Sequence, residues 1–213
     1  ARRGDLAHLL VAQQAPQGQA LGEEAVRRFG LKKGDVAIVF GPFDQQPERY
    51  VREGATADAL EAAGLKVIRI PSPTEWAADP NLAIPVITAA LTNNPDTKAI
   101  IYPGGQLLGN APTYMQAAGK KPGEVMLVSS NGAPVGLDLI RKGWEQVEVE
   151  QPMVAQAAAL AMFADKVVNK EEIKPGTYNV TGLESELTIE SWGPNIKIPG
   201  AAITKENVDD PKC

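Results

Sequence analysis

The sequence predicts an α/β protein built on a doubly wound parallel sheet. Short apolar runs that resemble strands alternate with segments in which apolar residues recur at helical spacing. Residues 36–40 are apolar at every position, which is typical of a strand buried on both faces of a parallel sheet. Right-handed crossovers between such strands place helices on both faces, so we expect one such sheet over residues 35–150. The strand-like runs begin at Val36, Lys66, Lys98, Val125 and Glu145.

The first half of the chain opens with an apolar run at residues 6–11, which predicts a strand leading into a polar connection. The strand at Val36 ends at Gly41-Pro42, and Lys66 begins the next strand. Asp79 is suited to cap the helix that follows it, and Pro80 is suited to the first turn. Helices are expected at residues 17–29, 48–63 and 82–93.

The second half repeats this alternation and contains a β-loop-α-β unit at residues 125–152. The strand at residues 98–102 precedes Pro103-Gly104-Gly105-Gln106 and a helix that closes at Gly119. The next strand breaks at the polar loop 129–134, whose Asn131-Gly132 pair tolerates left-handed backbone and exposes an amide. A helix from about Val135 then stops at Gly143, before the strand that includes Val147 and Val149.

The composition of the chain changes after Gln151-Pro152. An alanine-rich helix is expected over residues 153–168. Short β-like runs follow at residues 178–181, 187–190 and 196–198, separated by glycine and proline. They predict an antiparallel or irregular tail rather than another βα unit.

Charge and cysteine content exclude several classes of protein. The 213 residues carry a net charge of −5 and have a pI near 5.1, so the chain lacks the basic footprint of a nucleic-acid-binding protein. No segment approaches the ~18 consecutive apolar residues of a membrane span. The single cysteine, Cys213, excludes an internal disulfide and a thiolate zinc cluster.

Residues typical of catalysis are missing from the places where they would act. A catalytic triad would have to use His8, which is better explained as an ordinary packed or surface histidine. No Gly-x-Gly-x-x-Gly lies between a strand and a helix, and no Walker-type Gly-Lys-Ser/Thr occurs. We therefore expect no enzyme, no cofactor and no metal site.

Polar side chains instead gather after the predicted strands. Ligands of open α/β sheets bind beyond the carboxyl ends of the strands, so Asn131 and Gln151 fall where a small polar molecule would bind. Asp44 and Gln45 follow the strand at Val36, and Arg52 lies on the next helix. Amide, carboxylate and guanidinium groups together provide the donors and acceptors that sugar hydroxyls need. This mixture indicates recognition of hydroxyls rather than bond breaking.

Two aromatic residues in loops after predicted strands, Phe43 and Trp76, are candidates to cover the apolar face of a sugar. Each also has an alternative interpretation as a packing residue. In the same way, Asp44-Gln45-Gln46 is either a ligand contact or a solvated turn. Arg52 is either a ligand contact or a surface ion-pair residue.

A series of short motifs, in order and over most of the chain, resembles the type I periplasmic sugar-binding proteins that serve ABC transporters. This family includes ribose receptors and the autoinducer-2 and rhamnose branch. The motifs are Val36 to Gly41, Arg52-Glu-Gly54, Ala59-Leu60, Ala63-Gly64, Leu91-Thr-Asn-Asn-Pro95-Asp96, Ala117-Ala-Gly119-Lys120, Gly143, Gln151-Pro152 and Ile203-Thr-Lys-Glu-Asn207-Val208.

The resemblance implies roles for individual residues. Arg52 and Gln151 match sugar-contacting residues of ribose-type receptors, whereas Asn131 stands where those receptors usually have aspartate. Gly104-Gly105 replaces their Asn-Asp, which argues against ribose itself. Asp44, Gln45 and Pro103 match the ligand-binding residues of the autoinducer-2 branch. The predicted ligand-binding set is Asp44, Gln45, Arg52, Trp76, Pro103, Gly105, Asn131 and Gln151.

The resemblance also implies a domain organisation in which most of a first lobe is absent. Residues 1–15 would be a crossing strand and hinge, residues 16–150 the second lobe, and residues 151–213 a hinge return with segments of the first lobe. The expected function is a solute receptor that binds a sugar or sugar-like molecule between two lobes and delivers it to a membrane permease. The expected location is periplasmic or extracellular, with a lipid anchor on an absent N-terminal segment as a further option.

Two alternatives share this fold class. One is the effector-sensing domain of a sugar-responsive transcriptional repressor, which would need an upstream helix-turn-helix segment. The other is a flavodoxin-like enzyme, which the missing catalytic residues disfavour.

Overall fold

The computed structural model describes residues 14–45, 51–102, 107–149, 153–174, 176–180, 187–190, 193–195 and 202–210. The chain divides into two compact units. We call Gly18–Gln151 with Ala201–Cys213 the sheet unit, and Ala1–Gln17 with Pro152–Gly200 the tail unit. No helix in the described ranges is both long and apolar enough to cross a membrane.

The sheet unit contains a six-stranded sheet in the order β2-β1-β3-β4-β5-β9. The first five strands along the chain pair in parallel, and only β9 runs antiparallel to its neighbour β5. The predicted parallel sheet over residues 35–150 is therefore confirmed. The strands are β1 (Val36–Gly41), β2 (Lys66–Pro71), β3 (Thr97–Tyr102), β4 (Met126–Ser130), β5 (Val147–Val149) and β9 (Ala202–Ile203).

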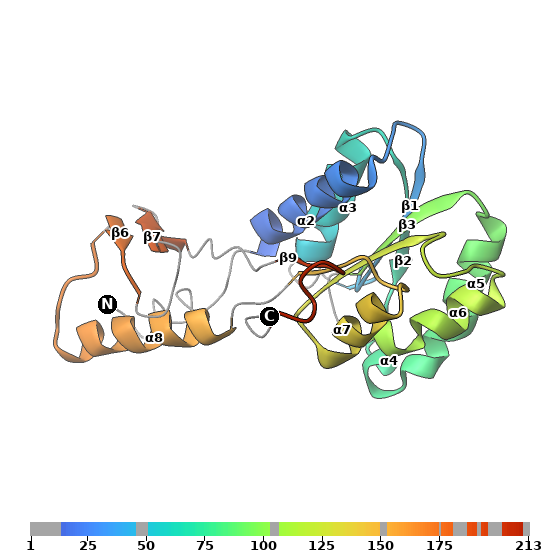
Figure 1. The fold of residues 1–213 in the computed structure, drawn as a ribbon. Helices are drawn as coiled ribbons and strands as arrows, with labels where there is room; N and C mark the ends of the chain where they lie inside the picture. Colours follow the sequence, from blue (N-terminus) through green and yellow to red (C-terminus); the bar gives the residue numbers. More distant parts are fainter. Residues whose placement is uncertain are drawn as a thin grey trace. The chain divides into compact units, whose positions relative to one another are not determined.

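Helices cover both faces of this sheet, as a doubly wound fold requires (Figure 1). One face carries α2 (Gln14–Phe29) and α3 (Val51–Ala62). The other face carries α4 (Glu75–Ala78), the turn η2 (Pro80–Leu82), α5 (Ala83–Asn93), η3 (Leu108–Asn110), α6 (Ala111–Ala117) and α7 (Pro134–Arg141). Strand β1 separates the two cores, because successive side chains of a strand point to opposite faces. Ala37 and Val39 pack with Leu21 and Leu60, whereas Ile38 and Phe40 belong to the other core.

Helices α2 and α3 cross at very short range. The hydroxyl of Thr56 donates to the carbonyl of Gly18 at 2.9 Å. A Cβ atom added to Gly18 would lie 2.0 Å from the carbonyl oxygen of Arg52, and one added to Gly22 would lie 2.9 Å from the Cβ of Ala59. Glycine at these positions therefore lets α2 pack directly on the backbone of α3.

The predicted turn residues adopt the expected backbone conformations. Gly119 and Gly143 end their helices with φ of 73° and 76°, and Asn131 and Gly132 have φ of 113° and 71°. Asp79 does act as a cap, but for η2, where its carboxylate accepts from the backbone N–H of Asn81 at 3.0 Å.

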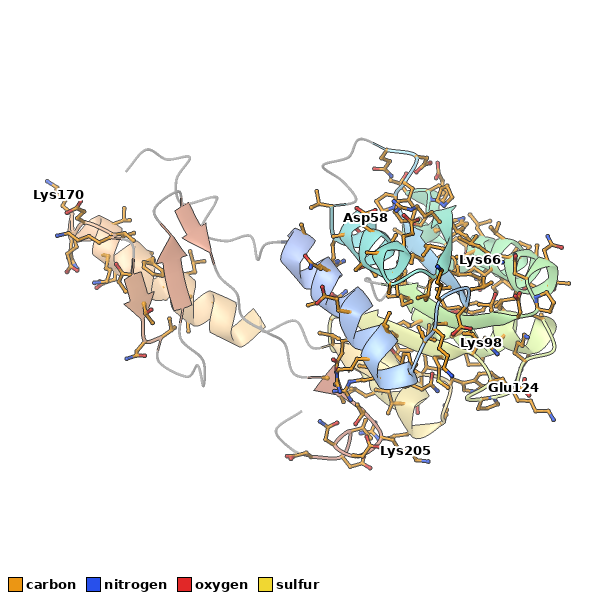
Figure 2. The ribbon with its side chains drawn as sticks, turned by 90° about the horizontal axis from the view of Figure 1, so that it is seen from above. Asp58, Lys66, Lys98, Glu124, Lys170 and Lys205 are labelled. Atoms are coloured by element: carbon orange, nitrogen blue, oxygen red, sulfur yellow. The ribbon has the colours of Figure 1, made fainter. Side chains whose placement is uncertain are left out.

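The sides of the sheet formed by the amino ends and by the carboxyl ends of the parallel strands differ in character. Exposed charged side chains stand where three of the strands begin, at Lys66, Lys98 and Glu124 (Figure 2). The amino ends of β2, β3 and β4 therefore meet water at this edge. The loops that carry the predicted ligand contacts follow the opposite, carboxyl ends.

The tail unit consists of α8 (Met153–Val168) and an antiparallel sheet of β6 (Gly176–Tyr178), β7 (Leu187–Glu190) and β8 (Gly193–Asn195). Its core contains Ala159, Phe163 and Val180, and the ring of Tyr178 lies edge-on to that of Phe163 at 5.2 Å between centroids. The predicted helix and antiparallel tail are both present. The runs predicted as strands at residues 6–11, with His8, and at 196–198 lie outside the described residues.

The last described segment of the chain belongs to the sheet unit. Ala202–Ile203 pair with β5 as β9. Ile203 and Val208 also bury their side chains against Ile140 of α7. A sheet edge leaves backbone groups unpaired, and β9 covers that edge of β5.

Candidate functional site

The topology of the sheet creates a crevice between β1 and β3. The connection after β1 leads to α3 on one face, whereas the connection after β3 leads to α6 on the opposite face. Loops that leave neighbouring strands in opposite directions open a gap at the carboxyl edge, where ligands of doubly wound folds bind. The site is therefore expected beyond Gly41 and Tyr102.

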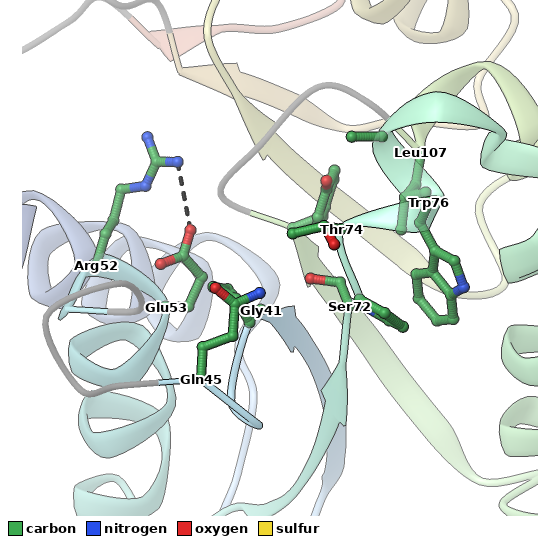
Figure 3. Close-up of a pocket in the computed structure, with 12 residues that line it drawn as sticks. Gly41, Gln45, Arg52, Glu53, Ser72, Thr74, Trp76 and Leu107 are labelled. Carbon is green, nitrogen blue, oxygen red and sulfur yellow. Dashed lines mark hydrogen bonds and ion pairs between the residues drawn. The ribbon is translucent and has the colours of Figure 1, made fainter.

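A cavity of about 220 Å³ lies at this point (Figure 3). Its wall comes from the segments that follow β1, β2 and β3 and from the first turn of α3. The lining residues are Gly41, Pro42, Gln45, Arg52, Glu53, Ser72, Pro73, Thr74, Trp76, Ala77, Tyr102 and Leu107. Figure 3 shows Arg52 and Glu53 on one side, with Ser72, Thr74 and Trp76 on the other.

Arg52 and Glu53 form a charged pair in the wall of the cavity. The Nη2 atom of Arg52 lies 3.4 Å from Oε1 of Glu53, and the two side chains are only 15% and 13% exposed. Within the described residues, the buried Nε of Arg52 has no hydrogen-bond acceptor. Leaving a buried donor unpaired typically costs about 1–3 kcal/mol, so this group is an open position for an acceptor atom of a ligand.

The predicted aromatic contact Trp76 has two roles in the structure. It lies on α4 rather than in a loop, and its side chain is 7% exposed and packs with Phe40 and Ile70. It also lines the cavity. Tyr102, at the end of β3, forms a second aromatic part of the wall and packs edge-on against Phe40 at 6.0 Å between centroids.

The residues predicted in the loop after β1 differ in whether they line the cavity. Gln45 lines the cavity, whereas Asp44 is exposed and does not. Phe43 lies under the guanidinium of Arg69, 5.7 Å from Cζ to the ring centroid, and does not line the cavity either. The packing interpretation therefore describes Phe43.

Asn131 follows β4, one strand further along the same edge. Its backbone N–H donates to the carbonyl of Val149 at 2.8 Å, and it is not among the lining residues of the cavity. The structure thus brings Gln45, Arg52 and Trp76 together and places Asp44 and Asn131 outside that group. Pro103, Gly105 and Gln151 lie outside the described residues.

Several residues of the cavity wall were not predicted from the sequence as ligand contacts: Glu53, Ser72, Thr74, Tyr102 and Leu107. Ser72 and Thr74 follow β2 directly, so the rule about carboxyl ends, applied to this strand, would have found them. Tyr102 was counted only as the last residue of a strand. Glu53 carries no sequence signal, since acidic residues are common in the first turn of a helix.

A cluster of buried polar side chains, Ser129, Glu145 and Glu148, lies next to the loop that carries Asn131. Glu145 and Glu148 are 2% and 0% exposed, and both carboxyl groups contact the hydroxyl of Ser129 at 2.5 Å. Burial, reinforced by the charge of Glu148, raises the pKa of Glu145 to about 9. Glu145 is therefore protonated and neutral at pH 7.

The fold and the cavity together define a class of protein: a doubly wound α/β lobe with a polar cavity at the carboxyl edge of its sheet. Residues 4–172 match the family model described as periplasmic binding protein domain. The chain therefore belongs to the periplasmic binding protein family, as the sequence motifs implied. This family consists of solute-binding proteins without catalytic activity, which agrees with the expectation for this chain.

Solved structures of sugar transport proteins share this fold. An ABC transporter solute-binding protein from Agrobacterium vitis with bound D-fucose matches 95% of this chain with a TM-score of 0.68 and 17% identity. One from Actinobacillus succinogenes with bound D-allose matches 93%, with a TM-score of 0.68 and 21% identity. A sugar-binding protein of a sugar ABC transporter from Bacillus halodurans matches 93%, with a TM-score of 0.71 and 15% identity.

The match covers only part of each of these proteins. The chain spans 61%, 62% and 64% of their respective lengths. No curated protein sequence matches the chain significantly.

Proposed function

We propose that this chain is the larger part of a solute receptor of an ABC importer, which binds a sugar or sugar-like molecule and delivers it to a permease. The observation that carries the proposal is the buried Nε of Arg52 in the wall of the cavity, which has no acceptor among the residues that the structure describes. A ligand hydroxyl or ring oxygen would supply the missing acceptor.

The chemistry of the wall suits a polyhydroxylated ligand. Arg52 only donates and Glu53 only accepts when ionised, whereas Gln45, Ser72 and Thr74 do both. Each sugar hydroxyl also donates and accepts, so it pairs with any of these groups. The indole of Trp76 and the ring of Tyr102 add apolar surface for the C–H face of a sugar ring.

The size of the cavity supports a site shared between two lobes. Complete small-molecule sites typically enclose ~300–1,000 Å³ and bury about 70–90% of the ligand. At about 220 Å³, the cavity is smaller than that range. We propose that the first lobe, which the sequence motifs imply, closes over the ligand by a hinge motion.

Isothermal titration of the chain with pentoses, deoxyhexoses, polyols and autoinducer-2 tests the proposal. We expect at least one of these compounds to bind, and Arg52→Ala to weaken that binding by about tenfold, the equivalent of one lost hydrogen bond. The matched control is Arg27→Ala, which removes an exposed arginine paired with Glu24. Equal loss in both variants, or unchanged binding in Arg52→Ala, would reject the assigned cavity.

A further inference from the structure

The loop that carries Asn131 is anchored from below by a buried carboxylate. Glu148 of β5 accepts hydrogen bonds at Oε1 from the backbone N–H groups of Gly132 and Ala133, at 2.7 and 3.2 Å. Ala133 immediately precedes α7 and has no side-chain oxygen to cap that helix. Glu148 therefore supplies, from a neighbouring strand, the acceptor and negative charge that a helix N-terminus favours.

The other oxygen of Glu148 belongs to a chain of hydrogen bonds whose direction follows from counting protons. Ser129 Oγ lies 2.5 Å from both Glu148 Oε2 and Glu145 Oε1, but a hydroxyl has only one hydrogen to donate. One carboxyl group must therefore donate to Ser129, and the protonated one is Glu145. Glu145 donates to Ser129, Ser129 donates to Glu148, and Glu148 accepts from the loop.

The surroundings of the pair agree with this arrangement. Among the described residues, the groups that interact with Glu145 are Glu148, Ser129 and the phenol of Tyr114 on α6. Within the described residues, Oε2 of Glu145 has no hydrogen-bond partner. An unpaired oxygen costs far less on a neutral carboxylic acid than on a carboxylate.

Helix α7 is shaped around the carboxyl groups. A Cβ atom added to Gly136 would lie 2.1 Å from Oε2 of Glu148 and 3.2 Å from Oε2 of Glu145. No larger residue fits at position 136 unless the carboxyl groups move. Gly136 is therefore part of the same buried arrangement as the two glutamates.

We propose that Glu148 is a positioning residue for the ligand, because it fixes the loop that carries Asn131. Asn131 has φ of 113°, a conformation that few residues other than glycine adopt readily. Its own N–H is held by the carbonyl of Val149, and the next two N–H groups are held by the side chain of Glu148. Strand β5 thus sets the loop through both its backbone and its one buried acidic side chain. This inference rests on the proposed function and adds Asn131, which does not line the cavity, as a further ligand contact.

The test compares Glu148→Gln with Glu148→Leu in the full chain. Glutamine keeps a carbonyl oxygen for Gly132 and Ala133, and its NH₂ group donates to Ser129, which then donates to Glu145. Leucine removes every one of these contacts. We expect amide hydrogen exchange at Gly132 and Ala133 to remain slow in Glu148→Gln and to accelerate at least about tenfold in Glu148→Leu.

Ligand affinity is the second measurement. The probe is whichever of D-fucose, D-allose and D-ribose binds the unaltered chain most tightly. Glu148→Leu should weaken binding of the probe by about tenfold, whereas Glu148→Gln should keep most of the affinity of the unaltered chain. If Glu148→Leu does not fold, Gly136→Ala serves instead, because it displaces the two carboxyl groups while keeping both glutamates. It should accelerate hydrogen exchange at the amides of Gly132 and Ala133.

The outcomes separate the inference from the proposed function. Unchanged exchange at Gly132 and Ala133 in both Glu148→Leu and Gly136→Ala overturns the anchoring role, whatever the sugar affinity. Faster exchange together with unchanged probe affinity overturns the positioning role. Asn131→Ala tests the ligand contact by itself: if it binds the probe as the unaltered chain does, the proposed role of Asn131 fails.

Discussion

Tyr102 of β3 pairs directly with Ser129 of β4 in the parallel register of the sheet. The pair connects the two polar regions of this edge, because Tyr102 lines the cavity and Ser129 holds the buried carboxyl groups under the Asn131 loop. Neighbouring parallel strands lie ~4.8 Å apart, so Asn131 leaves the sheet one strand away from the cavity wall. A ligand that extends from Arg52 past Tyr102 would approach the loop that carries Asn131.

We predict that Glu53 is a ligand contact. Glu53→Gln keeps the shape of the side chain but removes its charge, which should weaken sugar binding by about tenfold, since hydrogen bonds to charged groups contribute ~1.5–3 kcal/mol. Glu61→Gln, on the same helix and paired with Arg69, is the control. Titration calorimetry of both variants measures the effect, and unaltered affinity in Glu53→Gln would remove this residue from the site.

The two roles of Trp76 are separable with a matched tryptophan. Trp76 and Trp144 are each 7% exposed and belong to the same core, but only Trp76 lines the cavity. Replacing either with leucine should lower the free energy of unfolding by about 2–4 kcal/mol, because a large buried side chain is truncated. Only Trp76→Leu should also weaken sugar binding. Denaturant unfolding and calorimetry on both variants decide this, and equal affinities would leave Trp76 as a packing residue alone.

Glu145 should make stability fall as the pH rises. Its carboxyl group loses its proton near the ordinary pKa of 4.5 in the unfolded chain but keeps it to about pH 9 in the folded chain. Between these values the unfolded state binds fewer protons, so stability that is fully present below pH 4.5 declines by up to ~1.4 kcal/mol per pH unit.

Glu145→Gln removes this titrating group while retaining a donor for Ser129. Thermal unfolding from pH 5 to 9 should therefore show the variant gaining stability over the unaltered chain as the pH rises. Exposed Glu172→Gln is the control and should follow the unaltered chain. Parallel curves for Glu145→Gln and the unaltered chain would mean that Glu145 is ionised in the folded state.

The crossing of α2 and α3 should not tolerate a methyl group. Gly18→Ala places Cβ against the backbone carbonyl of Arg52, and such overpacking typically costs about 1–3 kcal/mol. Gly109→Ala is the control, since its nearest contact would be a side-chain atom of Val135 at 3.9 Å. Urea unfolding measures both, and a Gly18→Ala variant as stable as Gly109→Ala would contradict the close crossing.

A version of the protein extended through its upstream reading frame should bind sugar far more tightly than this chain. A ligand on one lobe leaves its outer hydroxyls in water, and each hydrogen bond to a second lobe would add ~0.5–1.5 kcal/mol. Several such bonds raise the affinity by orders of magnitude. Calorimetry on both versions with the same sugar panel tests this prediction, and equally tight binding would show that the chain already holds a complete site.

Local patterns were enough to predict the parallel sheet and its helices. The apolar run at residues 36–40, the alternation of strands with helices, and glycine at positions 119 and 143 each report the conformation of their own segment. Of the residues predicted as ligand contacts, Gln45, Arg52 and Trp76 line the cavity, whereas Asp44 and Asn131, which follow strands in the same way, do not. The predictions of strands, helices and turns succeed because hydrophobic period and turn chemistry depend on neighbours in the sequence.

Only the tertiary structure decided which distant residues meet. Strand order places the ends of β1, β2 and β3 around one cavity, which brings Glu53, Ser72 and Tyr102 together and leaves Asp44 in water. The pairing of β9 with β5 and the hydrogen bonds from Gly132 and Ala133 to Glu148 are likewise non-local. A buried glutamate in a short strand has the sequence appearance of an exposed one. Its surroundings are set by the segments that pack over it. Which segments pack there depends on the free energy of the whole fold, not on the residues beside the glutamate in the chain.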